Sequence, residues 1–173
     1  MSAEPTTLAS WTRALRKQLD ALGLDSAALC RAAGFDPSLL DAPNARCPLS
    51  MTTRLWQLAA AASSAPALGL KTSQFVSPTT FHALGYALVA SSDALELELR
   101  ESADCYEFRF RVPPGSPPPA PEALDAFAAI YVRSCRNRLG RDFAPLAVHL
   151  QRAEPVDAQP WHAVFRAPLH FAA

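Results

Sequence analysis

The helix predicted over residues 79–90 carries side chains that suit the binding of a small molecule. Phe81 lies on one face of this helix, whereas His82 and Tyr86 lie one turn apart on another, so two faces are compatible with an apolar environment. Ligand sites are largely apolar with a few convergent polar groups, which an imidazole and a phenol can supply. A core helix covered on both sides explains the same pattern, so these residues line either a ligand site or the core.

Aromatic residues elsewhere in the chain can complete such a pocket. Trp56 lies off the apolar stripe of its predicted helix, Phe110 lies on the inward face of a predicted strand, and Tyr131 lies on a predicted helix that covers this strand. In such a pocket, Arg46 or Arg54 can pair with an effector carboxylate through the planar guanidinium group. Each aromatic residue can equally be core, and each arginine can equally make a surface ion pair.

Other kinds of chemistry have no recognisable pattern in the chain. There is no Gly-x-Ser-x-Gly elbow, no His-x-x-x-His pair and, with six glycines, no glycine-rich phosphate loop. The four cysteines are widely spaced, so we expect reduced and mostly buried thiols. His162 and His170 flank the last predicted strand and can approach each other, but a lone histidine is more often structural. We therefore expect no enzymatic activity, no cofactor and no metal; a hydrolase would need a Cys or Ser beside a base.

Charge and hydropathy limit the location and the partners of the chain. Sixteen Lys and Arg residues balance sixteen Asp and Glu residues, whereas a free-standing nucleic-acid binder usually shows a basic excess. Arginines gather over residues 133–141, at the end of a predicted helix, where the helix dipole favours cations; a phosphate-binding patch is the alternative to this structural interpretation. The sequence shows no signal peptide and no apolar run of roughly 18 residues. We therefore expect a cytoplasmic protein that makes no membrane contact and, alone, binds no DNA.

The first half of the chain, residues 1–91, is predicted to be helical. Apolar residues recur every three or four positions from Leu8 to Leu22, which predicts a first helix with one apolar face. Asp25 is the expected N-cap of a second, short helix, and Gly34 is the expected residue that ends it.

A loop over residues 41–48 is expected to lead to a third helix, with Ser50 as its N-cap. Further helices are predicted to begin near Ser64 and Ser77. The predicted apolar face of the third helix consists of Met51, Leu55, Leu58, Ala59 and Ala62.

The second half, residues 92–173, changes to the period of β-strands. Apolar and charged residues alternate over 95–100 and 106–112, which predicts a hairpin with one buried face. A proline-rich connector then leads to a long amphipathic helix that ends at Gly140 and is expected to lie across the hairpin. The alternation over 146–150 predicts a third strand.

A short helix and a strand-like segment follow, within residues 155–165 and at 169–171. The length of 173 residues and the hydrophobic content of 50% suit a single domain with its own core. The predicted fold is α+β: an N-terminal helical subdomain (1–91) followed by a small antiparallel sheet covered by a long helix (92–173).

Short motifs punctuate the chain in a distinctive order. They are Gly-Leu-Asp from residue 23, Gly-Phe-Asp-Pro from 34, Arg-Cys-Pro-Leu from 46, Leu-Gly-Leu from 68 and Leu-Gly-Tyr-Ala from 84. In this order they resemble the N-terminal effector-binding (arabinose-binding-like) domain of AraC-type bacterial transcription regulators. The resemblance implies that the chain binds a small-molecule effector and forms a homodimer. It also implies action on DNA only through a C-terminal helix-turn-helix region, which we expect this chain to lack.

The chain departs from the family pattern at Ser91–Asp93, where the family usually has a further amphipathic helix, so we expect a segment to be absent there. The apolar final residues, Leu-His-Phe-Ala-Ala, are expected to mark a boundary within a longer protein. Without the resemblance, a stand-alone small-molecule-binding or scaffold domain with no transcriptional role fits the residues nearly as well. Amino acids, aromatic acids and fatty or steroid-like molecules all fit an apolar site of this kind.

Overall fold

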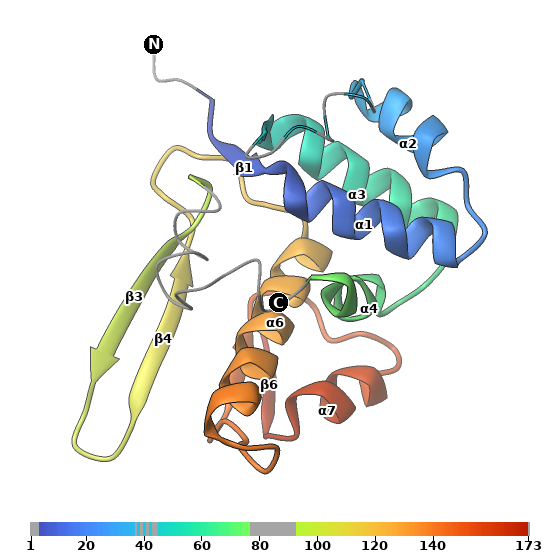
Figure 1. The fold of residues 1–173 in the computed structure, drawn as a ribbon. Coiled ribbons are helices and arrows are strands. Elements are labelled where there is room, and N and C mark those ends of the chain that lie inside the picture. The colour runs from blue at the N-terminus through green and yellow to red at the C-terminus, as the bar shows by residue number, and fades with distance from the viewer. Residues whose placement is uncertain are drawn as a thin grey trace.

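The fold is α+β, as predicted. The structure is a computed structural model of the 173-residue chain and describes residues 4–36, 38, 40, 42, 45–76 and 93–172. In chain order the elements are β1 (Thr6–Leu8), α1 (Ala9–Ala21), α2 (Ser26–Ala33), β2 (Arg46–Pro48), α3 (Leu49–Ser63), α4 (Leu68–Thr72), the 3-10 helix η2 (Ser73–Phe75), β3 (Glu96–Glu101), β4 (Tyr106–Arg111), α6 (Pro121–Leu139), β5 (Val148–Leu150), α7 (Gln159–Phe165) and β6 (Leu169–Phe171). Figure 1 shows the helices α1 to α4 grouped together, with the β3–β4 hairpin extending away from them beside α6.

The first two helices follow the sequence prediction closely. Trp11, Leu15 and Leu19 of α1 are buried in the core. The Asp25 carboxylate accepts a hydrogen bond of 2.8 Å from the Ala28 backbone N–H, which caps the start of α2. Gly34 ends α2 in the left-handed conformation, with φ of 97°, which a residue without a Cβ adopts at little cost.

The predicted loop before α3 is partly a strand instead. Arg46–Pro48 form β2, which pairs antiparallel with β1. Ser50 is not the N-cap of α3, because this helix begins one residue earlier, at Leu49. The Ser50 backbone N–H donates instead to the Glu4 carboxylate at 2.9 Å, and hydrogen bonding to Ser50 lowers the pKa of Glu4. This cap could not be predicted from neighbouring residues, because its acceptor lies 46 residues from Ser50 in the sequence.

The buried face of α3 differs from the predicted face. It consists of Leu49, Thr52, Leu55, Trp56 and Ala59, so Trp56 lies in the core and is only 2% exposed. Helices α1, α2 and α6 all pack against α3, and together they cover more of its surface than a single stripe would need. Ser64, expected to start the next helix, ends α3 in the left-handed conformation with φ of 48°.

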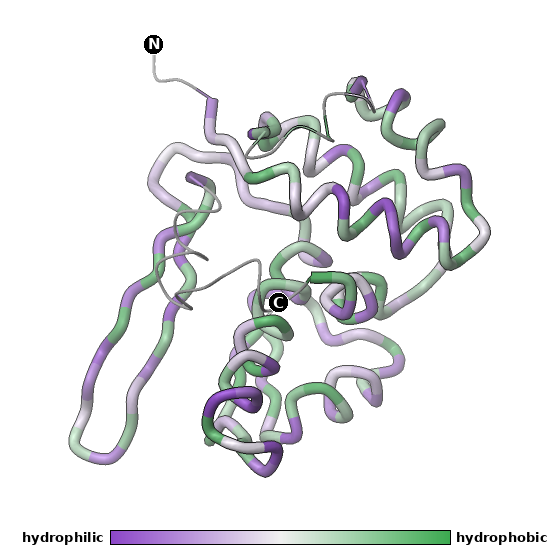
Figure 2. Tube along the Cα trace, in the orientation of Figure 1, coloured by the Kyte–Doolittle hydropathy of each residue, from purple (hydrophilic) through white to green (hydrophobic). Residues whose placement is uncertain are grey.

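The predicted hairpin forms, but its apolar face is only partly covered. Glu98 lies opposite Arg109 and Arg100 lies opposite Glu107 across the two antiparallel strands. Figure 2 shows the alternation of hydrophilic and hydrophobic residues along both strands. The inward face is half-buried near the base, but Leu99 is 56% exposed and Phe108 is 42% exposed. The prediction of one buried face is therefore wrong for the distal half of the hairpin.

The third predicted strand does not join the hairpin. Strand β5 pairs in parallel with β6, and α7 lies in the connection between them. This crossover places Trp161 and Phe165 in a second core cluster, against Val132 of α6. Leu146 lies outside β5 and is exposed. Parallel strands need a crossover of about this length, which the alternation pattern alone does not reveal.

Helices α4 and α6 cross at very close range at Gly69. A Cβ atom at this position would lie 2.0 Å from the backbone oxygen of Glu122 and 3.0 Å from the Cβ of Asp125. Around this crossing, Leu68 contributes to the first core cluster, whereas Ala67 and Leu70 contribute to the second. The Leu-Gly-Leu motif is therefore explained by the packing of these two helices.

We predict that Gly69→Ala destabilises the protein. In an ordinary helix interior this change stabilises by about 0.5–1 kcal/mol, but here the added methyl group must push α4 away from α6, at a cost of about 1–3 kcal/mol. Chemical denaturation of the variant measures the difference. Lys71→Ala, on the exposed side of the same helix, is the matched control and should have little effect. A more stable Gly69→Ala protein would show that the crossing is not tight.

Candidate functional site

Aromatic rings form a continuous series from α1 to the hairpin, which we call the aromatic cluster: Trp11, Phe108, Phe110, Phe127 and Tyr131. Trp11 of α1 stacks on Phe127 of α6, with ring centroids 4.3 Å apart. Phe110 of β4 meets both Phe127 and Tyr131 edge-on, at 6.0 and 5.8 Å. Phe108, nearer the tip of the hairpin, contacts Tyr131 at 4.7 Å. The cluster therefore connects the N-terminal helices, α6 and the hairpin.

A small cavity lies beside the aromatic cluster. It has a volume of about 30 Å³, and its walls are mostly apolar. This is room for about one water molecule, whereas sites for small ligands usually enclose about 300–1,000 Å³. An effector can enter here only if the surrounding side chains or the hairpin move. The lining residues are Thr7, Trp11, Leu49, Thr52, Trp56, Leu95, Pro119, Ala123, Leu124 and Phe127.

The predicted aromatic site residues of the described chain lie around this region. Trp56 forms part of the cavity wall, and Phe110 and Tyr131 are partners within the aromatic cluster. Burial raises the pKa of the Tyr131 phenol, so this group is protonated at neutral pH and can donate a hydrogen bond. Phe81 and His82, with the rest of the helix predicted over 79–90, lie outside the described residues.

Tyr86 and the junction at Ser91–Ser92 also lie outside the described residues.

The two arginines predicted to bind an effector, Arg46 and Arg54, are both described, and both lie outside the aromatic cluster. Arg46 forms an ion pair of 2.9 Å with Asp93 and donates to the Thr6 hydroxyl at 2.6 Å. Hydrogen bonding to Thr6, together with the charge of Arg46, lowers the pKa of Asp93. Arg54 is exposed on α3.

Arg46 also borders a second cavity, of about 120 Å³, next to β2. This cavity is separate from the aromatic cluster, and its described walls include Gly34, Phe35, Asp36, Leu40, Cys47 and Met51. The ion pair with Asp93 ties β2 to the start of the second half of the chain. Arg46 would have to leave Asp93 in order to bind an effector carboxylate.

A buried ion pair, which was not predicted from the sequence, joins Asp125 of α6 to Arg152. The two side chains are 2.5 Å apart, and Asp125 is only 1% exposed. The guanidinium of Arg152 also lies over the ring of Trp161, 5.1 Å from its centroid. One signal was available in the sequence: an acidic residue between Leu124 and Phe127, within the apolar face of the predicted helix.

Burial raises the pKa of Asp125 to about 6. The positive charge of Arg152 opposes this shift, and so does the indole of Trp161. The Trp161 Nε1 atom lies near enough to influence the carboxyl but is not in hydrogen-bonding geometry with a described partner. At pH 7 most of Asp125 is therefore ionised and paired with Arg152.

The arginines near the end of α6 bind backbone carbonyl groups. Arg136 donates to the oxygens of Phe143, Val164 and Phe165, and so holds the end of α7. Arg133 donates to the oxygen of Val76 at 2.6 Å. These contacts support the structural interpretation of the arginine-rich segment, since two of its members bind the protein itself.

The described histidines and cysteines show no constellation for metal chemistry. His170 stacks on His149 across the β5–β6 pair, with ring centroids 4.5 Å apart. Within the described ranges, no group of three or more His, Cys, Asp or Glu side chains could hold a metal ion. All four cysteines are free; Cys30 and Cys47 are buried, as expected, whereas Cys105 is exposed.

A comparison with protein families identifies the chain. A family model described as the arabinose-binding domain of AraC transcription regulator, N-term, matches residues 23–96 and 90–173. The chain therefore belongs to this family of N-terminal domains, which are ligand-sensing regulatory domains and not a known enzyme family. No curated protein matches the chain. Among the described helices, none combines the length and the apolar character that crossing a membrane requires.

We predict that Asp125→Asn changes how stability depends on pH. An acid whose pKa is raised in the folded state holds its proton more tightly there, so its contribution to stability increases as the pH falls from about 7 to about 4. The full difference is up to about 3 kcal/mol, at 1.36 kcal/mol for each pKa unit.

Thermal melts of the wild type and the variant between pH 4 and pH 7 test this prediction. The wild type should gain stability relative to Asp125→Asn as the pH falls. Asp142→Asn, at an exposed position, is the control, and its stability should change with pH in the same way as that of the wild type. If the stability of Asp125→Asn also changed with pH in the same way as that of the wild type, the raised pKa of Asp125 would be contradicted.

Proposed function

We propose that this domain binds a small-molecule effector at the aromatic cluster, forms a homodimer, and controls a DNA-binding domain attached to it in a cytoplasmic bacterial regulator. The observation that carries the proposal is the position of the aromatic cluster. Its rings come from α1, α6 and β4, so a ligand among them would touch the N-terminal helices and the hairpin at once. The family of the chain supports a sensing role.

The proposed site has an apolar wall and a few polar groups. Trp56, Phe110 and Tyr131 are its proposed residues within the described chain, and the Tyr131 hydroxyl would supply a hydrogen bond. Phe81, His82 and Tyr86 are proposed to line the same site, on the sequence argument alone.

Arg46 and Arg54 lie outside the aromatic cluster, so each is the proposed partner of a carboxylate on an effector that extends beyond the cluster. The guanidinium of Arg46 would exchange Asp93 for the effector, and Arg54 would bind from its exposed position on α3. The effector that fits this set has an apolar or aromatic body, and an acidic group is accommodated only if one of these arginines takes part.

The proposed mechanism uses the small size of the cavity. Because about 30 Å³ holds no effector, binding must separate groups that now touch. Phe127 of α6 lines the cavity and contacts Phe110 of β4, so this contact is the one that links the cavity to the hairpin. Ligand binding would then favour an arrangement of the hairpin different from the one described. A difference of about 1–3 kcal/mol in affinity between the two arrangements is enough to shift an attached domain.

We predict that an effector will change the fluorescence of Trp11 and Trp56. The chain has three tryptophans, and the third, Trp161, lies in the second core cluster. A Trp161→Phe variant therefore reports from the proposed site alone. Amino acids, aromatic acids, fatty acids and steroids are titrated in turn, and a thermal shift is measured in parallel, since a ligand at 100 times its Kd adds about 2.7 kcal/mol of stability. A ligand that shifts the melt but leaves this fluorescence unchanged binds elsewhere.

We also predict that Tyr131→Phe weakens the binding of an effector found in this way. Loss of one hydrogen bond of about 1–1.5 kcal/mol corresponds to a roughly tenfold higher Kd. Tyr106→Phe is the matched control, because Tyr106 lies at the exposed tip of the hairpin and its hydroxyl donates to Glu101 at 3.0 Å. Equal affinity of the wild type and both variants for the effector would show that the Tyr131 hydroxyl does not bind it.

A further inference from the structure

The outer edge of β3 has no partner strand among the described elements. Among the described residues β3 pairs with β4 alone. Strand β4 lies between β3 and α6 in Figure 1, and its Phe108 contacts Tyr131 of α6. The edge of β3 is therefore the one that faces away from the other described elements. It has six residues and contains no proline, but four of its side chains are charged, so it can pair only with a strand of complementary charge.

The hydrogen-bonding pattern of the hairpin shows which groups of β3 point outward. The Ser102 backbone N–H donates to the oxygen of Cys105 at 2.9 Å, next to the pair of Glu101 and Tyr106. Hydrogen-bonded and non-hydrogen-bonded pairs alternate along an antiparallel ladder. The backbone N–H and C=O groups of Leu97, Leu99 and Glu101 therefore point away from β4, towards a further strand.

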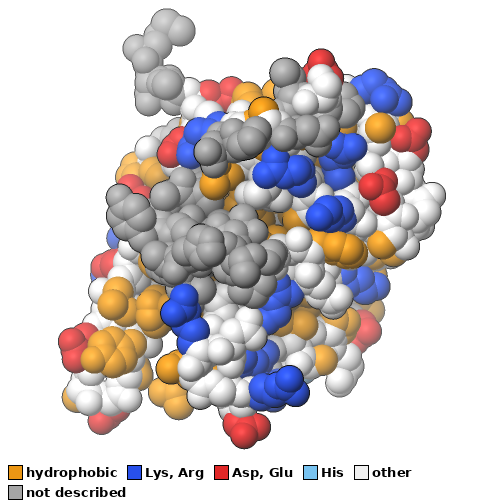
Figure 3. Space-filling model, in the orientation of Figure 1, with side chains coloured by type: hydrophobic (Ala, Val, Ile, Leu, Met, Phe, Trp, Pro, Cys, Tyr) orange, Lys and Arg blue, Asp and Glu red, His pale blue; other side chains and the backbone are white. Residues whose placement is uncertain are grey.

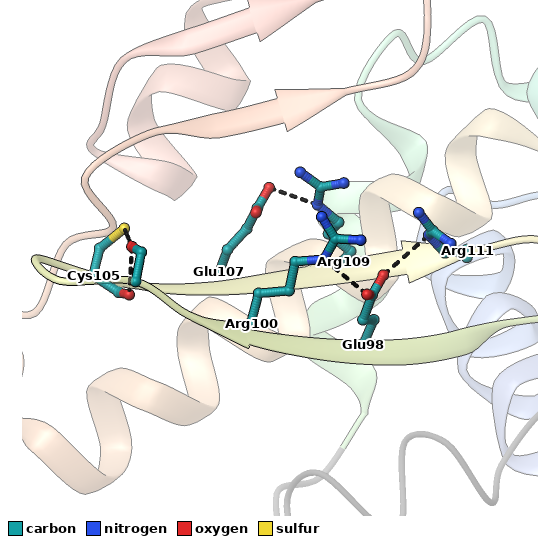
Figure 4. Close-up of polar contacts among 7 residues, drawn as sticks. Glu98, Arg100, Cys105, Glu107, Arg109 and Arg111 are labelled. Carbon is teal, nitrogen blue, oxygen red and sulfur yellow. Dashed lines mark hydrogen bonds and ion pairs between the residues drawn. The ribbon is translucent and has the colours of Figure 1, made fainter.

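Charged side chains alternate with apolar ones along the same edge. Figure 4 shows Glu98 between Arg100 and Arg111 on the polar face, with ion-pair distances of 2.7 and 3.1 Å. On the opposite face Leu99 is 56% exposed and Tyr106 is 63% exposed. Figure 3 shows hydrophobic side chains gathered on the hairpin at the lower left of the molecule.

We infer that the edge of β3 binds the β3 strand of a second copy of this chain, antiparallel and centred on Leu99. This register makes the outward backbone groups of the two strands hydrogen-bond to each other. It places Glu98 of each copy opposite Arg100 of the other, so that the directly opposed charges differ in sign. Opposite charges across neighbouring strands stabilise their pairing, and like charges destabilise it.

Neighbouring registers lose this match of charges. A shift of the centre from Leu99 to Glu98 brings the two Glu98 side chains together, and a shift to Arg100 brings the two Arg100 side chains together. The register centred on Leu99 also places the two Leu99 side chains side by side and joins the two exposed apolar faces of the hairpins into one. The result is a four-stranded antiparallel sheet across a two-fold axis.

This inference rests on the proposed function, in which the domain forms a homodimer. It adds the surface and the register, and it connects dimerisation to the aromatic cluster through β4. Phe110 at the base of the hairpin belongs to the aromatic cluster and lies opposite Leu97 of β3. A change in the aromatic cluster would therefore alter the position of the dimer contact.

Disulfide trapping tests the register. In a Cys105→Ser background, Leu99→Cys should form a covalent dimer under mild oxidation, because directly opposed residues in a hydrogen-bonded pair have Cα atoms about 5.5 Å apart, within reach of a disulfide. Leu97→Cys is the matched control on the same face. Its two copies would lie about 13 Å apart along the strands and should not cross-link. Equal cross-linking of both variants, or cross-linking of Phe108→Cys in place of Leu99→Cys, would overturn the inference.

Charge reversal gives a second, independent test by sedimentation velocity. Glu98→Arg alone and Arg100→Glu alone should each weaken self-association about tenfold, because each homodimer then holds two pairs of like charges. An equimolar mixture of the two variants should form heterodimers with the same affinity as the wild-type homodimer, because every opposed pair is again of opposite sign. Thermal melts of each variant show that it is folded.

The outcomes separate the inference from the proposed function. Single variants that associate like the wild type, or a mixture that gains nothing, would overturn the β3 contact. A wild-type dimer without cross-linking at Leu99→Cys would leave dimerisation in place and reject this surface. A wild-type chain that is monomeric at several hundred micromolar would reject both, whereas effector binding is measured separately by fluorescence.

Discussion

The close crossing of α4 and α6 at Gly69 is the contact on which the rest of the structure depends. Among the described elements no sheet runs through both halves of the chain; the strands form three separate pairs. The two core clusters meet instead at this crossing, where α4 contributes to both and α6 continues through both. Since the backbones touch here, a side chain larger than hydrogen would displace α6. The buried Asp125, the second core cluster and the rings of Phe127 and Tyr131 would all move with it.

Helix α6 contributes to both the buried ion pair and the aromatic cluster, through residues on different faces. Asp125 faces Arg152 and the second core cluster, whereas Phe127 and Tyr131 face α1 and the hairpin. The ion pair is short and Asp125 is almost fully buried, so loss of Arg152 would leave an unpaired charge in the interior. The aromatic rings of Phe127 and Tyr131 hold the hairpin by tilted and edge-on contacts. A contact of this kind can be exchanged for a ligand of similar chemistry at modest cost.

Local signals in the sequence predicted the local structure well, and contacts between distant residues account for what was missed. Asp25 and Gly34 mark the two ends of α2 because caps depend on neighbouring residues, and the alternation of charged and apolar residues marks the two strands of the hairpin. The alternation could not show which neighbour covers the apolar face, so the exposed tip of the hairpin was not foreseen. The Glu4 cap of α3, the β1–β2 pair and the ion pair of Asp125 join residues 27 to 46 positions apart. Of the candidate site, Trp56, Phe110 and Tyr131 could be chosen as aromatic residues, but their grouping depended on tertiary packing.

The hairpin is attached to the helices near its base, and this has a mechanical consequence. A strand of six residues is about 20 Å long, at 3.4 Å for each residue. A tilt of about 10° at the base would therefore carry the tip through about 3–4 Å, close to the 4.8 Å spacing between neighbouring strands. A displacement at Phe110 no larger than the radius of an atom is amplified along the strands. A tilt of the hairpin about its contacts with Tyr131 would therefore move the tip of the hairpin further than its base.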